Sequence, residues 1–427
     1  MSDPADSNSS QLQDFCQTIA RQAKEASRKL ALVDSRAKDQ WLKSCAAIFE
    51  SRVEQILQVN QEDCQAAQSA GSSAANLDRL QLNRQRLLGI TGSLRAIADL
   101  PDPVGEIIEG YRRPSGIEVR KVRVPIGVIF FIYEARPNVT SDAAAICVKS
   151  GNAVILRCGK EAIRTSSLLA GLMVEQLEPA GLPRHAIQMI ETPDRTVIDA
   201  LLARPQEIDL AIPRGGEGLI RRVCDLAKMP VLKHFDGNCH VYVDASADLK
   251  MAVDLVVNAK CQRMGVCNAC ESLVIHRSML PAFLPILADA LQPFAIEIRG
   301  DAEVCRVLPH ATPASEDDWY REYLGPCISI RTVDSIEEAI AHINQYGSHH
   351  TDAIVTSCLA SSRKFSQEVD SSAVMINAST RFNDGGELGL GAEIGISTDK
   401  FHARGPCGLK ELTTTKFIVT GQGHTRQ

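Results

Sequence analysis

The chain has 427 residues, 44% of them hydrophobic and 23% charged, a composition that excludes a disordered or fibrous protein and a length that predicts two or three domains. The 46 Lys and Arg against 52 Asp and Glu leave a formal net charge of −6 without a basic block, which argues against nucleic-acid binding. No apolar run approaches the roughly 20 residues that span a membrane. The polar start and the 14 scattered cysteines indicate reduced thiols and a cytoplasmic location rather than a secreted disulfide scaffold.

The N-terminal quarter is predicted to be helical. Residues 1–10 are expected to form a mobile tail. Over residues 11–100, apolar residues recur three or four positions apart, which indicates a series of amphipathic helices. Asn60 and Asn76 are predicted to begin two of them as cap residues.

A β-hairpin is predicted next, over residues 105–124. Apolar and charged residues alternate there on both sides of a Pro-Ser-Gly turn at 114–116. Because both faces are polar and the segment separates helical from α/β sequence, we expect an arm rather than a core element. A short strand at 416–419 is predicted to end the chain.

From residue 126 onward, short apolar runs alternate with helical stretches, which is typical of parallel sheets buried on both faces. One series covers residues 126–244 and a second begins near residue 258. The predicted fold class is therefore α/β, with two doubly wound domains and a small β module. The predicted strands are 126–133, 153–156, 186–190, 209–212, 231–232 and 240–243, then 273–275, 296–298, 328–330, 353–355 and 373–376. The predicted helices are 141–149, 166–177, 196–203 and 217–227, then 279–291, 335–345 and 361–369.

A phosphate-binding turn is predicted at Pro213-Arg214-Gly215-Gly216, which follows the strand 209–212 and opens a helix. Glycines there leave backbone N–H groups free beside a helix N-terminus, an arrangement that suits a phosphate. The alternative is a tight strand-to-helix turn without a ligand. No G-x-G-x-x-G follows a strand, so a plain Rossmann fingerprint is absent.

A nucleophilic thiol is predicted at Cys267, between Gly265 and Asn268. A position near a helix start would stabilise its thiolate. The pair Cys267 and Cys270 has no second Cys pair to complete a zinc site, so no metal is expected. A buried, inert thiol is the alternative for any one cysteine.

Polar residues follow the strand 126–133, where α/β sheets place their ligands. Glu134, Arg136 and Asn138 lie there. The side-chain amide of Asn138 is a candidate to stabilise an oxyanion, and its alternative role is to cap the following helix.

These segments, in this order, resemble the aldehyde dehydrogenase superfamily over nearly the whole chain from about residue 11. Within it, they are most similar to the family of γ-glutamyl phosphate reductases. The residues that carry the resemblance are 123–127, 131–140, 149–157, 212–216, 236–244, 265–269, 346–352 and 377–385.

The resemblance implies three parts and a set of site residues. An NADP(H)-binding domain would comprise residues 11–104 and 125–257, a catalytic domain 258–409, and an oligomerisation module 105–124 and 410–427. Cys267 would be the catalytic nucleophile and Asn138 the oxyanion donor. The cofactor would be held by Arg157, Pro213, Arg214, Gly215, Gly216 and Glu322, and the substrate by Arg136, Arg381 and Asn383.

The implied activity is the NADPH-dependent reduction of L-glutamyl 5-phosphate to L-glutamate 5-semialdehyde with release of phosphate, the second step of proline biosynthesis, through a Cys267 thioester. His234 stands where aldehyde-oxidising members carry a general-base glutamate, which argues against the alternative of a hydrolytic aldehyde dehydrogenase. A catalytically silent binding protein is the other alternative. The resemblance also implies a homo-oligomer and a possible association with glutamate 5-kinase, without nucleic-acid or membrane partners.

Overall fold

The computed structural model describes residues 4–233 and 235–426, and the chain divides into two compact units. Unit 1 contains the residues up to Lys233, Leu390–Gly395 and the residues from Cys407 onward; unit 2 contains His234–Gly389 and Ile396–Pro406. The expected boundary at residue 257 is wrong. Strand β7 (Cys239–Val243) pairs with β8 (Cys270–His276), so it belongs to the sheet of unit 2.

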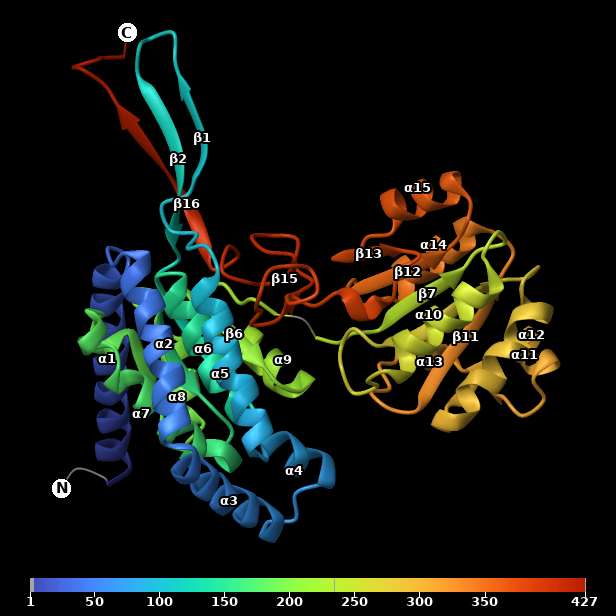
Figure 1. The fold of residues 1–427 in the computed structure, drawn as a ribbon, viewed down its shortest axis with the longest axis horizontal. Coiled ribbons are helices and arrows are strands. Elements are labelled where there is room, and N and C mark those ends of the chain that lie inside the picture. Colours follow the sequence, from blue (N-terminus) through green and yellow to red (C-terminus); the bar gives the residue numbers. More distant parts are fainter. Residues whose placement is uncertain (1–3, 234, 427) are drawn as a thin grey trace. The chain divides into compact units, whose positions relative to one another are not determined.

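Unit 1 is built on a four-stranded parallel sheet in the order β5-β4-β3-β6 (Figure 1). All side chains of β3 and β4 are buried, because helices cover both faces and the strands are apolar throughout. The predicted strand at 231–232 is wrong, since Val231 forms only an isolated bridge to Ala211. The strands are β3 (Val128–Tyr133), β4 (Ala153–Arg157), β5 (Ile187–Met189) and β6 (Leu210–Arg214).

Helices pack on the two faces of this sheet according to the side-chain alternation of β3. Val128, Phe130 and Ile132 share a core with residues of α1 (Pro4–Leu30) and α8 (Thr196–Leu202). Tyr133 points to the other face, where its hydroxyl forms a 2.7 Å hydrogen bond with Thr140. The helices of that second face are α6 (Pro137–Lys149), α7 (Ile163–Glu175), α2 (Ser35–Ser51) and α5 (Arg84–Asp99), and α9 (Glu217–Leu226) follows β6.

The expected tail and the two expected cap residues of the N-terminal helices are wrong. Helix α1 begins at Pro4, inside the segment expected to be a mobile tail, and residues 1–3 lie outside the described residues. Asn60 does not cap a helix: it lies within α3 (Val53–Ser69), where its buried amide binds the Leu80 carbonyl at 3.0 Å and the Leu82 N–H at 2.7 Å. Asn76 does not begin a helix either: it lies in the first turn of α4 (Ala74–Leu80), where its N–H donates to the side chain of the cap residue Ser73 at 3.3 Å. Asp34 caps α2 and Asn83 caps α5.

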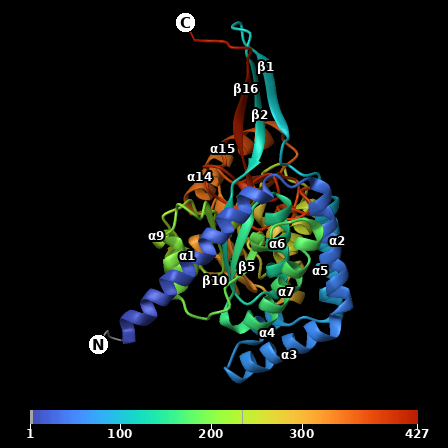
Figure 2. The same ribbon diagram turned by 90° about the vertical axis from the view of Figure 1, so that its left-hand side faces the viewer.

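A three-stranded antiparallel sheet extends from unit 1 in both views (Figures 1 and 2). It has the order β1-β2-β16, with β1 (Ile107–Arg112), β2 (Glu118–Pro125) and β16 (Thr413–Thr420). This confirms that the hairpin near 105–124 pairs with the last strand of the chain. Every residue of β1 is exposed, as expected for an arm.

Unit 2 holds a seven-stranded parallel sheet in the order β10-β9-β11-β8-β7-β12-β13, and the α/β fold class is confirmed. One face packs on α10 and α11, the other on α14 and α15. The further strands are β9 (Glu297–Gly300), β10 (Thr312–Pro313), β11 (Cys327–Val333), β12 (Thr351–Val355), β13 (Ala373–Ile376), β14 (Ile396–Ser397) and β15 (Gly405–Pro406). The helices are α10 (Leu249–Cys261), α11 (Leu280–Leu291), α12 (Ala302–Val307), α13 (Glu316–Tyr320), α14 (Ile336–Tyr346) and α15 (Leu359–Glu368).

Across the described residues of both units, none of the helices combines the length and apolarity needed to traverse a bilayer.

Candidate active site

Cys267 lies half-buried in the turn that joins α10 to β8 in unit 2. The expectation that it stands near a helix start is wrong, because α10 ends at Cys261 and the chain enters a strand at Cys270. Burial raises the pKa of Cys270 to about 12, so that neighbouring thiol stays protonated at neutral pH. Cys267 is thus the less enclosed of the two.

The backbone of Cys267 is held from one side by the segment that leads into β7. A β-carbon at Gly237 would overlap the carbonyl of Cys267, so only glycine fits this close approach. The Cys239 thiol donates a hydrogen bond to the same carbonyl at 3.1 Å. Burial raises the pKa of Cys239 well above its usual range, which keeps this donor protonated. Sequence reasoning missed Gly237, although the Asp-Gly-Asn at 236–238 is a turn signal.

The turn is also held from the segment after β13. Arg381 donates from Nε to Gln262 Oε1 at 2.7 Å and from Nη1 to Asn268 Oδ1, so one guanidinium binds on both sides of Cys267. The amide of Asn268 donates to the Asn383 carbonyl at 3.0 Å. The structure therefore brings Arg381 and Asn383 to the predicted nucleophile.

Asn383 itself is fully buried. Its side-chain amide donates to Thr351 Oγ1 at 2.7 Å, whereas its Oδ1 has no hydrogen-bond partner among the described residues. A buried oxygen without a partner is costly. Asn383 therefore keeps one unused acceptor beside the segment that holds Cys267.

Glu322 reaches the same region from the segment before β11. Its Oε1 accepts the Gly237 N–H at 2.9 Å, and burial raises its pKa to about 7. Nearby, Glu271 and Lys260 form a fully buried ion pair, and Glu271 accepts the Leu324 N–H at 3.1 Å. Glu322 is therefore next to the segment that holds Cys267, while His234 lies outside the described residues.

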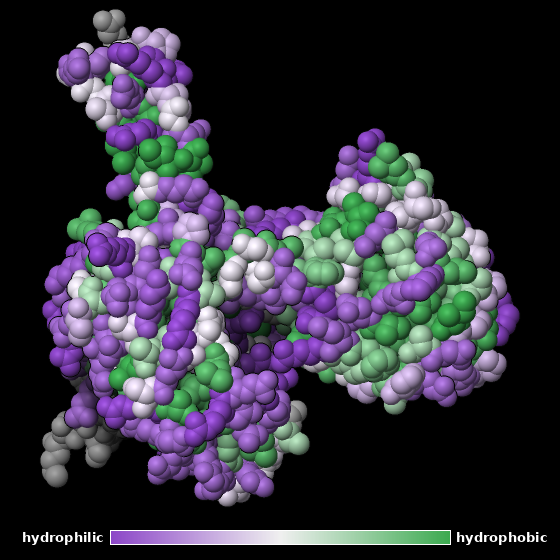
Figure 3. Space-filling model, in the orientation of Figure 1, coloured by the Kyte–Doolittle hydropathy of each residue, from purple (hydrophilic) through white to green (hydrophobic). Residues whose placement is uncertain are grey.

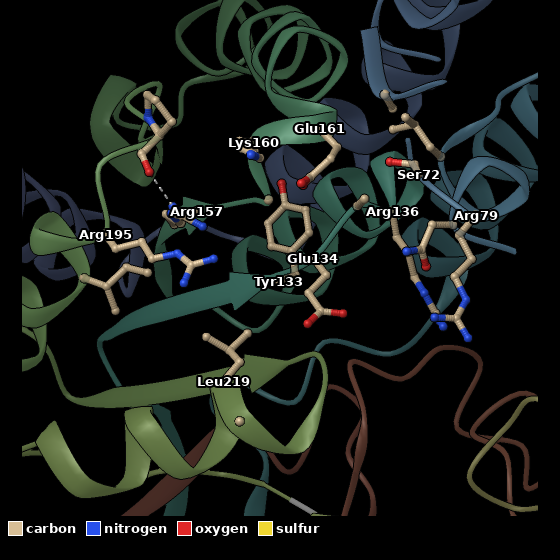
Figure 4. A pocket seen from close by; sticks show the side chains of 18 of the residues that line it. Ser72, Arg79, Tyr133, Glu134, Arg136, Arg157, Lys160, Glu161, Arg195 and Leu219 are labelled. Atoms are coloured by element: carbon tan, nitrogen blue, oxygen red, sulfur yellow. Dashed lines mark hydrogen bonds between the residues drawn. The ribbon is translucent and has the colours of Figure 1, made fainter. Parts of the chain in front are cut away.

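Unit 1 contains a cavity of about 450 Å³ near the carboxyl ends of its strands (Figure 4). Among the charged side chains that line it, basic ones outnumber acidic ones, as expected for a site that binds a polyanion. Sequence reasoning identified only Arg136 and Arg157 among them, because the others come from distant segments without a local motif. The basic residues are Arg79, Arg136, Arg157, Lys160, Arg195 and Arg222, and the acidic ones are Glu134 and Glu161.

Arg157 ends β4 and is only 8% exposed. Its Nη2 donates to the Pro193 carbonyl at 3.0 Å, and its Nε has no hydrogen-bond partner among the described residues. Burial lowers its pKa, with a smaller contribution from nearby Arg195, yet an arginine keeps its charge. No ion pair joins Arg157 to Glu161 within the described part of the chain. Arg157 therefore does not serve as the partner of Glu161 in a surface ion pair.

The predicted strand-turn-helix at 213–216 is confirmed, with β6 ending at Arg214 and Gly216 at the N-cap of α9. An anion does lie at this helix N-terminus, and it is the Glu134 carboxylate. Glu134 Oε1 accepts the Gly216 N–H at 3.0 Å, and a β-carbon at Gly215 would come within 2.7 Å of that carboxylate.

Asn138 is the second residue of α6 and does not cap it, since Arg136 holds the N-cap position. Its amide donates to Asp142 Oδ2 at 3.2 Å, one turn further along the helix. Burial raises the pKa of Asp142 to about 6, against the opposing effect of this hydrogen bond and one from Ser93. Asn138 is half-buried, with its amide oriented by Asp142.

Comparisons with known proteins agree with this architecture. A sequence model described as the aldehyde dehydrogenase family matches residues 7–318 and 307–417. The chain is 56% identical to a γ-glutamyl phosphate reductase of Rhodopirellula baltica over 411 residues, which are 96% of this chain and 95% of that protein. It is 53% identical to the protein of the same name from Anaeromyxobacter sp. (strain K), covering 96% and 97%.

A crystal structure of γ-glutamyl phosphate reductase from Thermotoga maritima superimposes with a TM-score of 0.94 at 42% identity, covering 96% of this chain and 100% of that one. High identity and the same fold therefore extend over almost the full length. The chain belongs to the aldehyde dehydrogenase family and, within it, to the family of γ-glutamyl phosphate reductases.

Proposed function

We propose that this protein reduces L-glutamyl 5-phosphate to L-glutamate 5-semialdehyde and inorganic phosphate, with NADPH as the reductant, in proline biosynthesis. The observation that carries the proposal is the identity of 50–56% to curated γ-glutamyl phosphate reductases over 96% of the chain. The geometry around Cys267 supports it, since the predicted nucleophile lies in a turn held by several separate contacts.

The Cys267 thiolate is the proposed nucleophile. It attacks the acyl carbon of the substrate, and the C–O bond to phosphate breaks, leaving a thioester on Cys267. After reduction, the thiohemiacetal collapses to the free aldehyde and the thiolate. Asn138 is the proposed oxyanion donor through its side-chain amide, together with the backbone N–H of Cys267.

The cavity of unit 1 is the proposed cofactor site. Its residues fit a phosphate-rich dinucleotide, because Arg157 offers an unpartnered Nε beside Arg195 and Lys160. The turn Pro213-Arg214-Gly215-Gly216 would hold further phosphate groups, and Glu322 the nicotinamide ribose. When bound, NADPH supplies the hydride that reduces the thioester.

Three residues are proposed to bind the substrate. Arg136 offers its guanidinium to the carboxylate or phosphate of the substrate, which are groups that arginine binds well. Arg381, whose Nε and Nη1 already bind Gln262 and Asn268, offers its Nη2. The buried Oδ1 of Asn383 suits the substrate ammonium group.

The sheet β1-β2-β16 is the proposed oligomerisation module. Apolar side chains gather on this extension (Figure 3), among them Ile107, Tyr111, Phe417 and Val419, all exposed. A reducing, cytoplasmic environment is proposed from the cysteines, which are all free thiols.

Replacing Cys267 by Ser tests the function. Because a hydroxyl is a far weaker nucleophile than a thiolate at neutral pH, Cys267→Ser should abolish the phosphate-dependent reduction of NADP⁺ by glutamate 5-semialdehyde, while NADPH still binds. Cys270→Ser is the matched control and should keep most activity, since that thiol is buried and protonated. Loss of activity in the control alone would place the nucleophile elsewhere.

A further inference from the structure

We propose that the Glu134 carboxylate competes with the phosphate groups of the cofactor: it occupies the N-terminus of α9 in the free protein and leaves it when the dinucleotide binds. The inference rests on the proposed cofactor site and concerns how that site sets its own affinity. Glu134 then sets the affinity for the cofactor by weakening its binding, rather than strengthening it as a direct contact would.

The position of Glu134 follows from two neighbouring parallel strands. β3 ends at Tyr133 and β6 at Arg214, and the Glu134 N–H donates to the Arg214 carbonyl at 3.2 Å. The side chain thus begins directly opposite the turn that opens α9, and its Oε1 accepts the Gly216 N–H at 3.0 Å. A β-carbon on Gly215 would come within 2.7 Å of the carboxylate. The absence of a side chain at Gly215 therefore leaves the space that the Glu134 carboxylate occupies.

A helix N-terminus stabilises whichever anion lies there, through its free N–H groups and the helix dipole. α9 is ten residues long and therefore has such an end. A second, independent observation points to an external anion in this cavity. Arg157, more than nine-tenths buried, lines it with an Nε that no described residue satisfies.

The balance of charge in the cavity also favours an external anion. Six basic side chains line it against two carboxylates, and one of these, Glu134, is placed where phosphate would bind (Figure 4). A dinucleotide must therefore either displace Glu134 from the Gly216 N–H or bind against its negative charge. Both routes reduce affinity, because a charge-assisted hydrogen bond is broken or like charges are brought together.

The experiment measures the affinity of the full-length protein for NADP⁺ by calorimetry at fixed ionic strength, with Glu134→Gln and Glu134→Ala. Loss of the internal anion should tighten NADP⁺ binding by about twofold to fivefold, the range for an anion at the exposed N-terminus of a helix. Glu161→Gln is the matched control, since it also removes a carboxylate from the cavity but not from the helix N-terminus. It should change the affinity by less than about 1.5-fold.

Circular dichroism establishes that each variant is folded before the affinities are compared, and two different replacements guard against a local defect of either one. Unchanged or weaker NADP⁺ binding in both folded Glu134 variants would overturn the inference, because the carboxylate would then be neutral or a positive contact. Equal tightening by Glu161→Gln would also overturn it, in favour of general cavity charge. If the wild-type protein binds no NADP⁺, the proposed cofactor itself fails.

Discussion

At the scale of single residues, Arg157 shows how burial separates a binding role from a surface role. A guanidinium in a mostly buried position loses hydration, and a single carbonyl, that of Pro193, does not replace it. An exposed arginine paired with Glu161 would need no further partner. The guanidinium of Arg157 instead lines a cavity, and its Nε has no hydrogen-bond partner among the described residues.

We expect Arg157→Ala to separate NADPH from NADH. If the guanidinium binds the 2′-phosphate, NADPH affinity should fall by about 1.5–3 kcal/mol, the usual range for a hydrogen bond to a charged group, while NADH affinity is nearly unchanged. Titration of both cofactors into both proteins measures this. Equal losses would instead assign Arg157 to the ribose hydroxyls or the pyrophosphate, and no loss would remove it from the site.

Asp142 gives a pH-dependent prediction with a definite sign. Burial raises its pKa to about 6 from a usual value of 3.8, so the folded protein holds this proton more tightly than the unfolded chain. Raising the pH from about 4 to 6 therefore lowers the free energy of unfolding, and the loss persists at higher pH. Asp142→Asn should remove this effect and stabilise the protein by about 3 kcal/mol at pH 7, but not at pH 4.

Urea unfolding at both pH values measures this difference, and equal stabilisation at pH 4 and pH 7 would contradict the role of ionisation. The substitution keeps an oxygen that accepts the Asn138 amide. The orientation of Asn138 should therefore survive.

At the scale of elements, the turn that carries Cys267 depends on a close approach of two backbones. We expect Gly237→Ala to displace it, because the added β-carbon overlaps the Cys267 carbonyl. Overpacking of this kind costs about 1–3 kcal/mol, and a nucleophile misplaced by about 1 Å loses roughly 10²-fold in rate. Thermal unfolding and steady-state turnover measure the two effects.

Gly171→Ala is the matched control for that substitution. Gly171 lies exposed within α7, and a β-carbon there meets nothing within 4 Å. The same Gly-to-Ala change should therefore leave activity intact and stabilise the protein by about 0.5–1 kcal/mol through helix propensity. A loss of activity in Gly171→Ala as large as in Gly237→Ala would contradict the steric explanation.

Elements were predictable from sequence where one local pattern determines them. The uninterrupted apolar run ending at Tyr133 predicted a strand buried on both faces, and the Gly-Gly at 215–216 predicted a strand-to-helix turn. The assignment of β7 failed because the last strand of one parallel sheet and the first of the next have the same local pattern. Which strands pair depends on contacts between distant parts of the chain, and the local spacing of apolar residues does not reveal those contacts.

The site was predictable only in part for the same reason. Cys267 is marked by its flanking glycine and asparagine, and the family resemblance assigned its role. Arg79, Arg195 and Arg222 belong to separate helices or loops and meet only in the folded cavity. The Glu134 carboxylate reaches the N-terminus of α9 because β3 pairs with β6, and the sequence does not show this pairing.

At the scale of the whole molecule, the sheet β1-β2-β16 is the part that unit 1 does not need for its own core. β1 and β16 are both edge strands, and most of their residues are exposed. Exposed edges with apolar side chains promote pairing with another chain. We therefore expect these exposed strand edges to be covered by another subunit in an assembly.

We therefore expect the double variant Phe417→Lys, Val419→Lys to dissociate the proposed oligomer. The two side chains are 59% and 57% exposed and, two residues apart, lie on one face of β16, so added charge there opposes contact between subunits without entering the core. Thr414→Lys, on the opposite face of the same strand, is the control for charge alone. Sedimentation velocity should show smaller species for the double variant and the wild-type species for the control. Wild-type assembly in the double variant would reject this sheet as the interface and leave its exposed edges without a partner.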